Sequence, residues 1–394
     1  MNLRLTIFAM LLSAGVAAPA SDIYAPVLAA VEAGSPALAA ARSLLEADVS
    51  DNATGLAPAD PEVEFGFLWG THSGMGHRKD VSVSQQFDFP TVYRRRRALA
   101  GALDDEAALR CIAERRRVLL QAKEVCIELI FANANYRMCD EHLANARRMV
   151  NTYTRMLEAG HTTRLEANKA RLAFAEAVSM SSEAAAERTN LRRRLAILCG
   201  ADSAPAFDYA EYPAAALAAD PDELCRRAIL ADPALEALRG AGRAAQVKVS
   251  LAKSLSLPKL SVGYQGEFVP GEGWQGVKVG LSLPLWENRR GTKAAQAAAI
   301  AAESSCEDAE TTFRSDFMAS YTRAAELDRV IAIMRETIEE ADNTELLTRA
   351  LAQGEISMLD YLNELEYMHQ ARLRLLEAER SLALEIARLT SHEL

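Results

Sequence analysis

The chain has 394 residues, 50% of them hydrophobic but only 6% aromatic, and a formal net charge of -10. That length allows one large unit or two smaller ones, and the prominence of Ala, Leu, Glu and Arg favours long helices and coiled coils. The net negative charge argues against nucleic acid as a partner, although local arginine runs mean that charge alone does not decide this.

Residues 1–20 have the pattern of a secretory signal peptide. Arg4 is the only early charge, residues 5–12 form a short apolar run, and residues 18–20 read Ala-Pro-Ala, which suits cleavage. A short uncleaved anchor is the alternative. No later apolar run has the length of a membrane helix, so a membrane span in the exported protein would have to consist of strands.

An internal repeat organises the remaining sequence. Residues 61–67 align with residues 258–264, 197 positions later, and Pro90 and Gly160 recur 194 positions later as Pro284 and Gly354. A three-residue deletion in a loop accounts for the change of offset. Each half therefore predicts the same order: helix, strand, loop, strand, very long helix, turn and helix.

The repeat predicts three segments after the signal peptide. The first repeat is expected at 21–200 and the second at 222–394, with a short Ala- and Pro-containing linker at 201–221.

Four segments alternate between apolar and polar residues, which indicates strands with one apolar face. They are expected at about 62–69, 81–89, 259–268 and 277–285, close to the roughly 9–11 residues that a tilted strand needs to cross a bilayer. A soluble sandwich would show the same alternation. Four strands are few for this length, however, and the tryptophans lie at strand ends or in a strand-joining loop, where interfacial aromatics occur. These are Trp69, Trp274 and Trp286.

Four strands cannot close a barrel in lipid, because about eight are the minimum. The chain must therefore associate if these strands cross a membrane. Three copies would supply about twelve strands, and two copies would also satisfy closure.

Long helices are expected after each strand pair, at about 91–159 and 287–353. A helix of some 67 residues spans about 100 Å, and the 4-3 spacing of its apolar residues indicates a coiled-coil seam. Gly160 and Gly354 end these helices. Return helices follow at about 161–198 and 355–391, which predicts two antiparallel hairpins.

The mature chain resembles the TolC-like outer-membrane efflux factors, the outer membrane efflux protein family. The resemblance rests on the duplicated strand pairs, on QQFDFP at 85–90 and LSLPLW at 281–286, and on the tip motifs GHTTRLE at 160–166 and GEISMLDYLN at 354–363. It implies an internally duplicated α+β fold. Long coiled-coil hairpins would form a periplasmic α-barrel, and four strands per protomer would contribute to a 12-stranded transmembrane β-barrel in a homotrimer.

The resemblance also implies a place and a role. The protein would lie in the outer membrane of a Gram-negative bacterium, with its helices in the periplasm. It would be a passive exit duct gated at its periplasmic tip. Its partners would be a periplasmic adaptor (a membrane fusion protein) and an inner-membrane pump of the resistance-nodulation-division type. The substrate, whether drug, metal ion or peptide, is not readable from the sequence.

By motif position, the resemblance makes three residues gate candidates: Asp360, Glu166 and Asn363. Three copies of an acid facing one another would select cations. The alternative is that the acids are ordinary solvated residues at a helix start, where negative charge is favourable.

The two tips are also adaptor-docking candidates by resemblance, whereas the alternative is a turn that needs only its glycine. The residues are Gly160, Thr163, Leu165, Gly354, Ser357 and Leu359.

Arginines recur just after the second strand of each half, as Arg95 with Arg96 and Arg289 with Arg290. Cations at a helix start oppose the helix dipole, so we expect a compensating partner. Outer-membrane lipid phosphates at the periplasmic rim are the hypothesis, and simple solvation is the alternative.

The sequence predicts no enzyme, cofactor or metal site, because it contains no phosphate-binding loop, nucleophile motif or clustered Cys and His. Its six cysteines are scattered through helical sequence, as expected for small buried apolar residues; a disulfide cannot be assigned. The remaining alternative is a periplasmic coiled-coil adaptor or scaffold.

Overall fold

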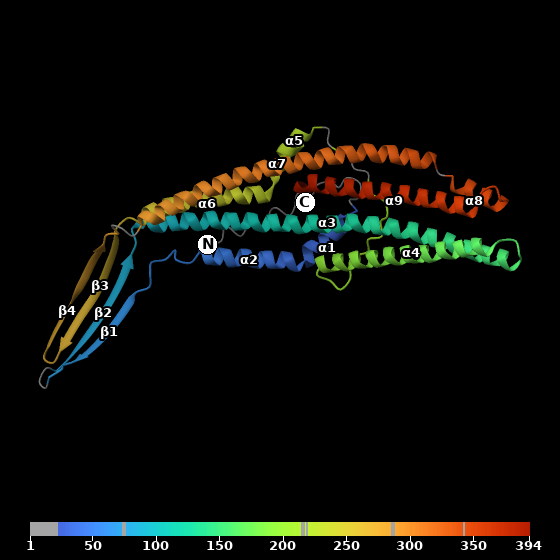
Figure 1. Ribbon diagram of the computed structural model, residues 1–394. Coiled ribbons are helices and arrows are strands. Elements are labelled where there is room, and N and C mark those ends of the chain that lie inside the picture. The colour runs from blue at the N-terminus through green and yellow to red at the C-terminus, as the bar shows by residue number, and fades with distance from the viewer. Residues whose placement is uncertain (1–22, 73–75, 214–216, 218–219, 285–287, 342) are drawn as a thin grey trace. The chain divides into compact units, whose positions relative to one another are not determined.

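The computed structural model describes residues 23–72, 76–213, 217, 220–284, 288–341 and 343–394 (Figure 1). The expected signal peptide at 1–20 and Trp286 lie outside these residues. The elements are α1 (Ala25–Gly34), α2 (Pro36–Asn52), β1 (Glu62–Trp69), β2 (His77–Phe87), α3 (Pro90–Glu158), α4 (Arg164–Leu198), α5 (Pro221–Ala231), α6 (Pro233–Ser254), β3 (Lys259–Val269), β4 (Glu272–Ser282), α7 (Arg289–Glu340), α8 (Thr344–Gln353), α9 (Met358–Leu389) and the 3-10 turn η1 (Ser391–Glu393).

The chain forms two compact units. Unit 1 contains the described part of Met1–Pro36, with Val118–Leu217 and Thr322–Arg388. Unit 2 contains Ala37–Arg117, Ala218–Tyr321 and Leu389–Leu394. Each unit takes segments from both sequence halves. The repeat thus describes the order of the elements along the sequence. Each compact unit, however, forms where corresponding parts of the two halves pack together.

Unit 2 carries an antiparallel sheet of four strands in the order β1-β2-β3-β4. The central pair joins the two halves of the chain, since Val83 on β2 faces Tyr264 on β3. The strands β2 and β4 begin earlier than the alternation predicts, at His77 and Glu272, because pairing continues to the turn: Trp69 faces His77, and Val269 faces Glu272.

Side-chain contacts place the four long helical segments of unit 1 in the order α4-α3-α9-α7, which Figure 1 also shows. Arg188 of α4 lies 4.5 Å from the ring centroid of Tyr136 on α3. Two ion pairs join α3 to α9, and two join α9 to α7. They are Glu124–Arg388 at 3.2 Å, Glu128–Arg380 at 3.5 Å, Arg335–Glu379 at 2.6 Å and Arg323–Glu385 at 2.7 Å.

The core of unit 1 is apolar, with Val31, Ile127, Ile130 and Leu195 at most 1% exposed. All six cysteines are free thiols, four of them buried. None of the helices in the described part of the chain is long and apolar enough to cross a membrane.

The helix expected at about 287–353 is two helices, so the prediction of one uninterrupted helix is wrong. α7 ends at Glu340 and α8 begins at Thr344. The sequence at 339–343 reads Glu-Glu-Ala-Asp-Asn. Acids oppose the dipole at a helix C-terminus, and Asp and Asn side chains compete for backbone hydrogen bonds, which together favour an end here.

Candidate functional site

One face of the unit 2 sheet is mostly apolar and largely exposed, with His77, Lys79, Gln85 and Gln275 as its polar side chains. The register brings together, from all four strands, Val63, Phe65, Phe67, Trp69, Val81, Val83, Phe87, Leu260, Val262, Tyr264, Phe268, Val277, Val279 and Leu281. Phe65 is 68% exposed and Val277 is 77% exposed. A soluble monomer rarely exposes so large a patch of apolar residues, so this face is expected to be covered by lipid or by another protein.

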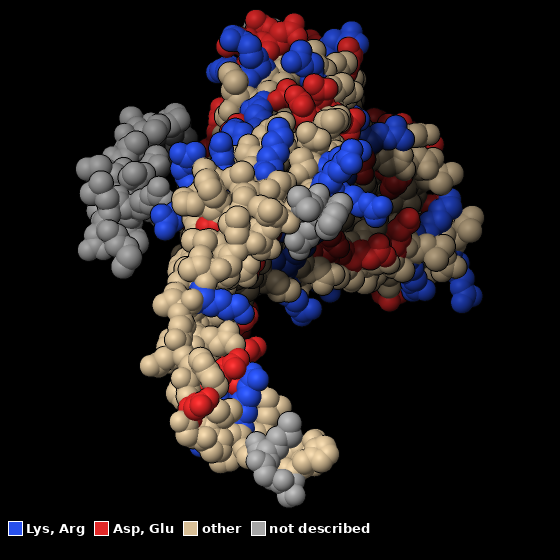
Figure 2. All heavy atoms as spheres, turned by 90° about the vertical axis from the view of Figure 1, so that its left-hand side faces the viewer, with Lys and Arg blue, Asp and Glu red and all other residues tan. Residues whose placement is uncertain are grey.

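The opposite face is polar and hollowed. A hollow of about 590 Å³ is lined by residues that include Glu64, Asp80, Gln265 and Lys278. Arg78 on this face makes ion pairs with Asp80 at 2.8 Å and with Glu267 at 3.0 Å. Figure 2 shows the sheet as a mostly tan projection with a few red and blue side chains. The sheet therefore has one mostly apolar face and one polar face that water can reach.

The sheet has two outer edges, because β1 pairs only with β2 and β4 only with β3 among the described residues. An edge strand presents unpaired backbone N–H and C=O groups that invite another strand.

The tryptophans predicted at a membrane interface occupy different positions. Trp69 is the last residue of β1 on the apolar face, with its ring centroid 6.1 Å from that of Phe67. Trp274 faces Glu267 across β3 and β4 and therefore shares the polar face. Trp286 lies outside the described residues. The register points only Trp69 toward the apolar side.

The four predicted arginines divide into two kinds. Arg96 forms a 2.6 Å ion pair with Asp88 and lies 5.7 Å from the Tyr93 ring centroid. Arg95, Arg289 and Arg290 are exposed. The sequence hypothesis of a lipid-facing side chain therefore fits these three better than it fits Arg96.

The two tips, residues 160–165 and 354–359, lie at the same end of unit 1 (Figure 1). Gly160 and Gly354 have φ angles of 73° and 76°, the left-handed region that glycine adopts at a helix end. Leu165 and Leu359 are 65% and 49% exposed. Each tip thus presents an exposed leucine beside a tight turn, and the docking assignment stays a prediction.

Each tip continues into a helix through a cap that the motif analysis missed. The Ser357 hydroxyl donates to Asp360 Oδ2 at 2.7 Å, the Ser357 N–H donates to the same oxygen at 3.3 Å, and the Asp360 N–H donates to Ser357 Oγ at 3.2 Å. This is a capping box. The Glu166 N–H donates to Thr163 Oγ1 at 3.3 Å in the same way. The Ser/Thr-x-x-acid spacing could have predicted both.

The gate candidates differ in their surroundings. Asp360 is exposed, and Asn363 is exposed three residues further along α9. Glu166 is half-buried, with one carboxylate oxygen 3.3 Å from Lys169 Nζ and the other buried without a hydrogen-bond partner. Only Asp360 combines the acid and the exposure that a charged ring in an aqueous passage would need.

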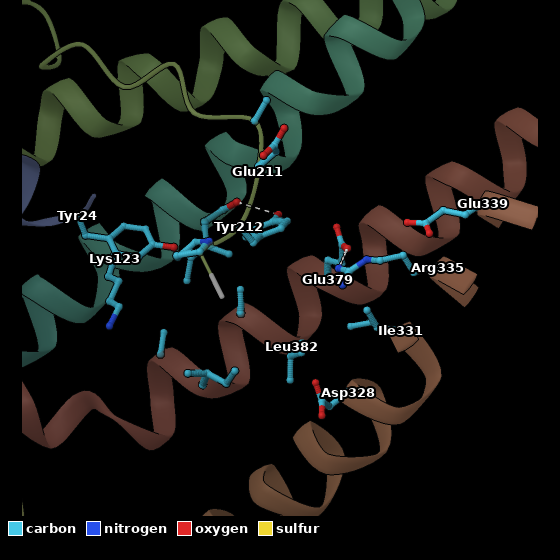
Figure 3. Close-up of a pocket in the computed structure, with 16 residues that line it drawn as sticks. Tyr24, Lys123, Glu211, Tyr212, Asp328, Ile331, Arg335, Glu339, Glu379 and Leu382 are labelled. Atoms are coloured by element: carbon cyan, nitrogen blue, oxygen red, sulfur yellow. Dashed lines mark hydrogen bonds and ion pairs between the residues drawn. The ribbon is translucent and has the colours of Figure 1, made fainter. Parts of the chain in front are cut away.

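A cavity of about 790 Å³ in unit 1 lies between α3, α7, α9 and the linker (Figure 3). The Tyr212 hydroxyl donates to the Ile127 carbonyl at 3.2 Å, and burial raises the pKa of Tyr212. The Arg335–Glu379 ion pair lies across the same cavity. The sequence did not indicate this cavity. The hydrogen bond of Tyr212 attaches the linker to α3.

Two histidines far apart in sequence meet in unit 1. The His142 and His369 ring centroids are 5.6 Å apart, and His369 is only 7% exposed with Nε2 unpartnered. Burial, and then His142, lowers the pKa of His369. Within the described residues, no group of three or more His, Cys, Asp or Glu could hold a metal ion.

Comparisons with known proteins concern part of the sequence and the fold of the chain. The family model for "Outer membrane efflux protein" matches residues 224–392. A search of curated proteins finds no match.

Solved structures match over nearly the whole chain. The CmeC outer membrane channel of Campylobacter jejuni has a TM-score of 0.74 at 16% identity, covering 94% of this chain and 85% of that one. The open state of the MtrE outer membrane channel of Neisseria gonorrhoeae has a TM-score of 0.75 at 16% identity, covering 93% and 88%. The outer membrane protein VceC of Vibrio cholerae has a TM-score of 0.64 at 16% identity, covering 93% of each chain.

The expected TolC-like α+β fold is therefore confirmed. Residues 224–392, less than half of the chain, match the outer membrane efflux protein family, and the chain shares its fold with the solved outer membrane channels.

Proposed function

We propose that the chain is one protomer of a homotrimeric outer-membrane duct, the passive exit component of a tripartite efflux system. The duct would cross the outer membrane through strands and continue into the periplasm through helices. Its periplasmic tip would be the gate. No protomer needs a reactive group for this role, since the wall only has to separate lipid from water.

The observation that carries the proposal is the amphipathic sheet with two open edges. In a bilayer every backbone polar group needs a partner inside the protein, so an open sheet edge is not tolerated there. Copies of the same chain can supply the missing neighbours if β4 of one copy pairs with β1 of the next. The exposed apolar face would then meet lipid, and the polar hollow would face the lumen.

The layer of helices in unit 1 also has two open edges that a neighbouring copy could cover. In the order α4-α3-α9-α7, the outer helices α4 and α7 keep exposed apolar side chains: Leu172 and Ile197 on α4 are 71% and 72% exposed, and Ile333 on α7 is 58% exposed. A neighbouring copy on each side would bury them. The same closed ring of copies would thus complete both units.

The tips support the proposed partners. Exposed loops on rigid scaffolds often carry binding, and each tip here joins two helices and exposes a leucine. We propose that a periplasmic adaptor docks at the tips and connects the duct to an inner-membrane pump of the resistance-nodulation-division type. Three copies of Asp360 near the gate would repel one another and attract cations.

Neighbouring residues on opposite faces of β1 provide the test. Phe65→Arg places a cation on the apolar face, where arginine costs about 2–4 kcal/mol at the bilayer midplane. Glu64→Arg makes a comparable change on the polar face. Cell fractionation followed by native electrophoresis in mild detergent should show outer-membrane trimers for the unaltered chain and for Glu64→Arg, and a strong loss for Phe65→Arg.

Two results would contradict the proposal. Equal assembly of both variants would show that the Phe65 face does not meet lipid. Recovery of the unaltered chain as a detergent-independent periplasmic monomer would favour the adaptor or scaffold function instead.

A further inference from the structure

The two helices that follow the sheet begin with an unusual excess of positive charge. Residues 90–103 of α3 contain four arginines and no acid, and residues 289–302 of α7 contain two arginines, one lysine and no acid. The chain as a whole has a net charge of -10. These two segments are therefore local exceptions in an acidic protein.

The strand register brings these segments to the same end of the sheet. Phe87 near the end of β2 faces Leu260 at the start of β3, and Leu260 faces Leu281 near the end of β4. Neighbouring strands lie about 4.8 Å apart, so β2 and β4 end within about 10 Å of each other. α3 and α7 start just beyond those ends. All of these residues belong to unit 2.

Five exposed arginines define what we call the cationic belt: Arg94, Arg95, Arg97, Arg289 and Arg290. Arg96 is not part of it, because Asp88 and Tyr93 already engage its guanidinium. No hydrogen bond or ion pair to another described residue is found for the five. The acids Asp60, just before β1, and Glu62, its first residue, are exposed, and within the described part of the chain neither forms an ion pair with a belt arginine.

The belt is unfavourable without an external anion. Neither α3 nor α7 has an acid in its first turn, and cations there oppose the helix dipole. Like charges on neighbouring side chains also repel one another. An anionic partner would relieve both costs.

The neighbouring apolar face indicates what that anion is. Phe87, Leu260 and Leu281 end the apolar face at the belt and are 36%, 44% and 65% exposed. A surface that meets hydrocarbon is followed immediately by the headgroup layer, where lipid phosphates lie. Arginine forms bidentate hydrogen bonds with phosphate oxygens. We propose that the cationic belt binds the phosphates of anionic phospholipids in the leaflet that faces the helices, an inference that rests on the proposed function.

The test compares two lipid probes at the protein surface. The purified trimer is reconstituted in phosphatidylcholine vesicles that contain traces of spin-labelled phosphatidylglycerol or spin-labelled phosphatidylcholine, and electron paramagnetic resonance gives their relative association. Basic residues near a charged membrane contribute about fivefold each at low salt. We expect a preference for phosphatidylglycerol of at least about fivefold.

Matched variants assign the preference to the belt. The belt variant replaces Arg94, Arg95, Arg97, Arg289 and Arg290 by Gln and should lose the preference. The control variant removes five exposed arginines from α3 and α4 in unit 1 and should keep it. Its positions are Arg147, Arg155, Arg171, Arg193 and Arg194.

Three outcomes would overturn the inference. They are an unaltered chain with no preference, a belt variant that retains it, and displacement of the labelled lipid by inorganic phosphate more than by chloride at equal ionic strength. The last would identify free phosphate as the ligand. A trimer that inserts but shows no preference would refute only the belt, whereas failure to trimerise or insert in phosphatidylcholine would refute the duct itself.

Discussion

Asp360 has two separable properties, its place in a capping box and its negative charge. The Ser357 hydroxyl and the Asp360 carboxylate each satisfy a backbone N–H at the start of α9, which explains why a small polar residue precedes an acid by three positions. The structural role does not exclude the gate role, since Asp360 remains exposed. The two roles can be distinguished by removing one property at a time.

Asp360→Asn removes the charge while keeping an oxygen acceptor, and Ser357→Ala removes the cap while keeping the charge. We expect Asp360→Asn to lower cation selectivity, measured as the reversal potential in a planar bilayer under a salt gradient. Ser357→Ala should instead lower stability by about 1 kcal/mol and leave selectivity unchanged. Unchanged selectivity in Asp360→Asn would leave Asp360 with the capping role alone.

His369 should make unit 1 sensitive to acid. Burial lowers its pKa in the folded state below the ordinary value, so the folded protein holds the neutral ring. Its contribution to stability is therefore complete above the ordinary pKa of about 6.5 and is lost as pH falls from there toward the lowered value. Melting temperatures between neutral and mildly acidic pH should fall more steeply in the unaltered chain than in His369→Leu. Parallel curves would contradict this prediction.

These residues show what local sequence can and cannot reveal. Both caps follow a spacing that the sequence contains, so Thr163 and Ser357 could have been predicted. The contact between His142 and His369 depends on how α3 meets α9, and no pattern near either residue encodes it.

At the element scale, periodicity predicted the strands and hairpins because each is built from contacts along or between adjacent segments. The pairing of β2 with β3 joins residues such as Val83 and Tyr264 from different halves, and alternation alone does not specify that partner. The break between α7 and α8 was missed because neither glycine nor proline marks it; weak helix formers and acids end α7 instead.

Replacing glycine by alanine tests the left-handed backbone conformation of the two turns. Gly160 and Gly354 have positive φ, a conformation that costs an L-residue about 1–2 kcal/mol. Gly160→Ala and Gly354→Ala should each lower stability by about that amount, measured by denaturant unfolding followed by circular dichroism. Gly101→Ala is the control, because that glycine lies within α3 with nothing within 4 Å of an added Cβ, and should raise stability by about 0.5–1 kcal/mol. Equal effects at all three positions would argue against cap-specific strain.

At the scale of the whole molecule, each unit ends in two edges that are exposed in the described part of the chain. The sheet in unit 2 ends in the edge strands β1 and β4, and the helical layer in unit 1 ends in α4 and α7 with exposed Ile197 and Ile333. In each unit the two edges are different elements, so a contact between unlike edges of neighbouring copies would cover both of them. Head-to-tail contacts close into a ring when the rotation between copies permits it, and we propose such a ring, in which every copy supplies one edge and receives the other.

The number of strands per copy and the charges on the polar face together predict how many copies form that ring. Two copies would give about eight strands, but a barrel of that size is filled by its own side chains. The polar face carries Glu64, Arg78, Asp80 and Glu267 beside a hollow of about 590 Å³, and charged groups of this kind need water. Three copies give about twelve strands and a wider lumen. Native mass spectrometry of the detergent-solubilised complex should therefore find three chains. A dimer would require these charges to be buried against one another and would contradict a water-filled duct.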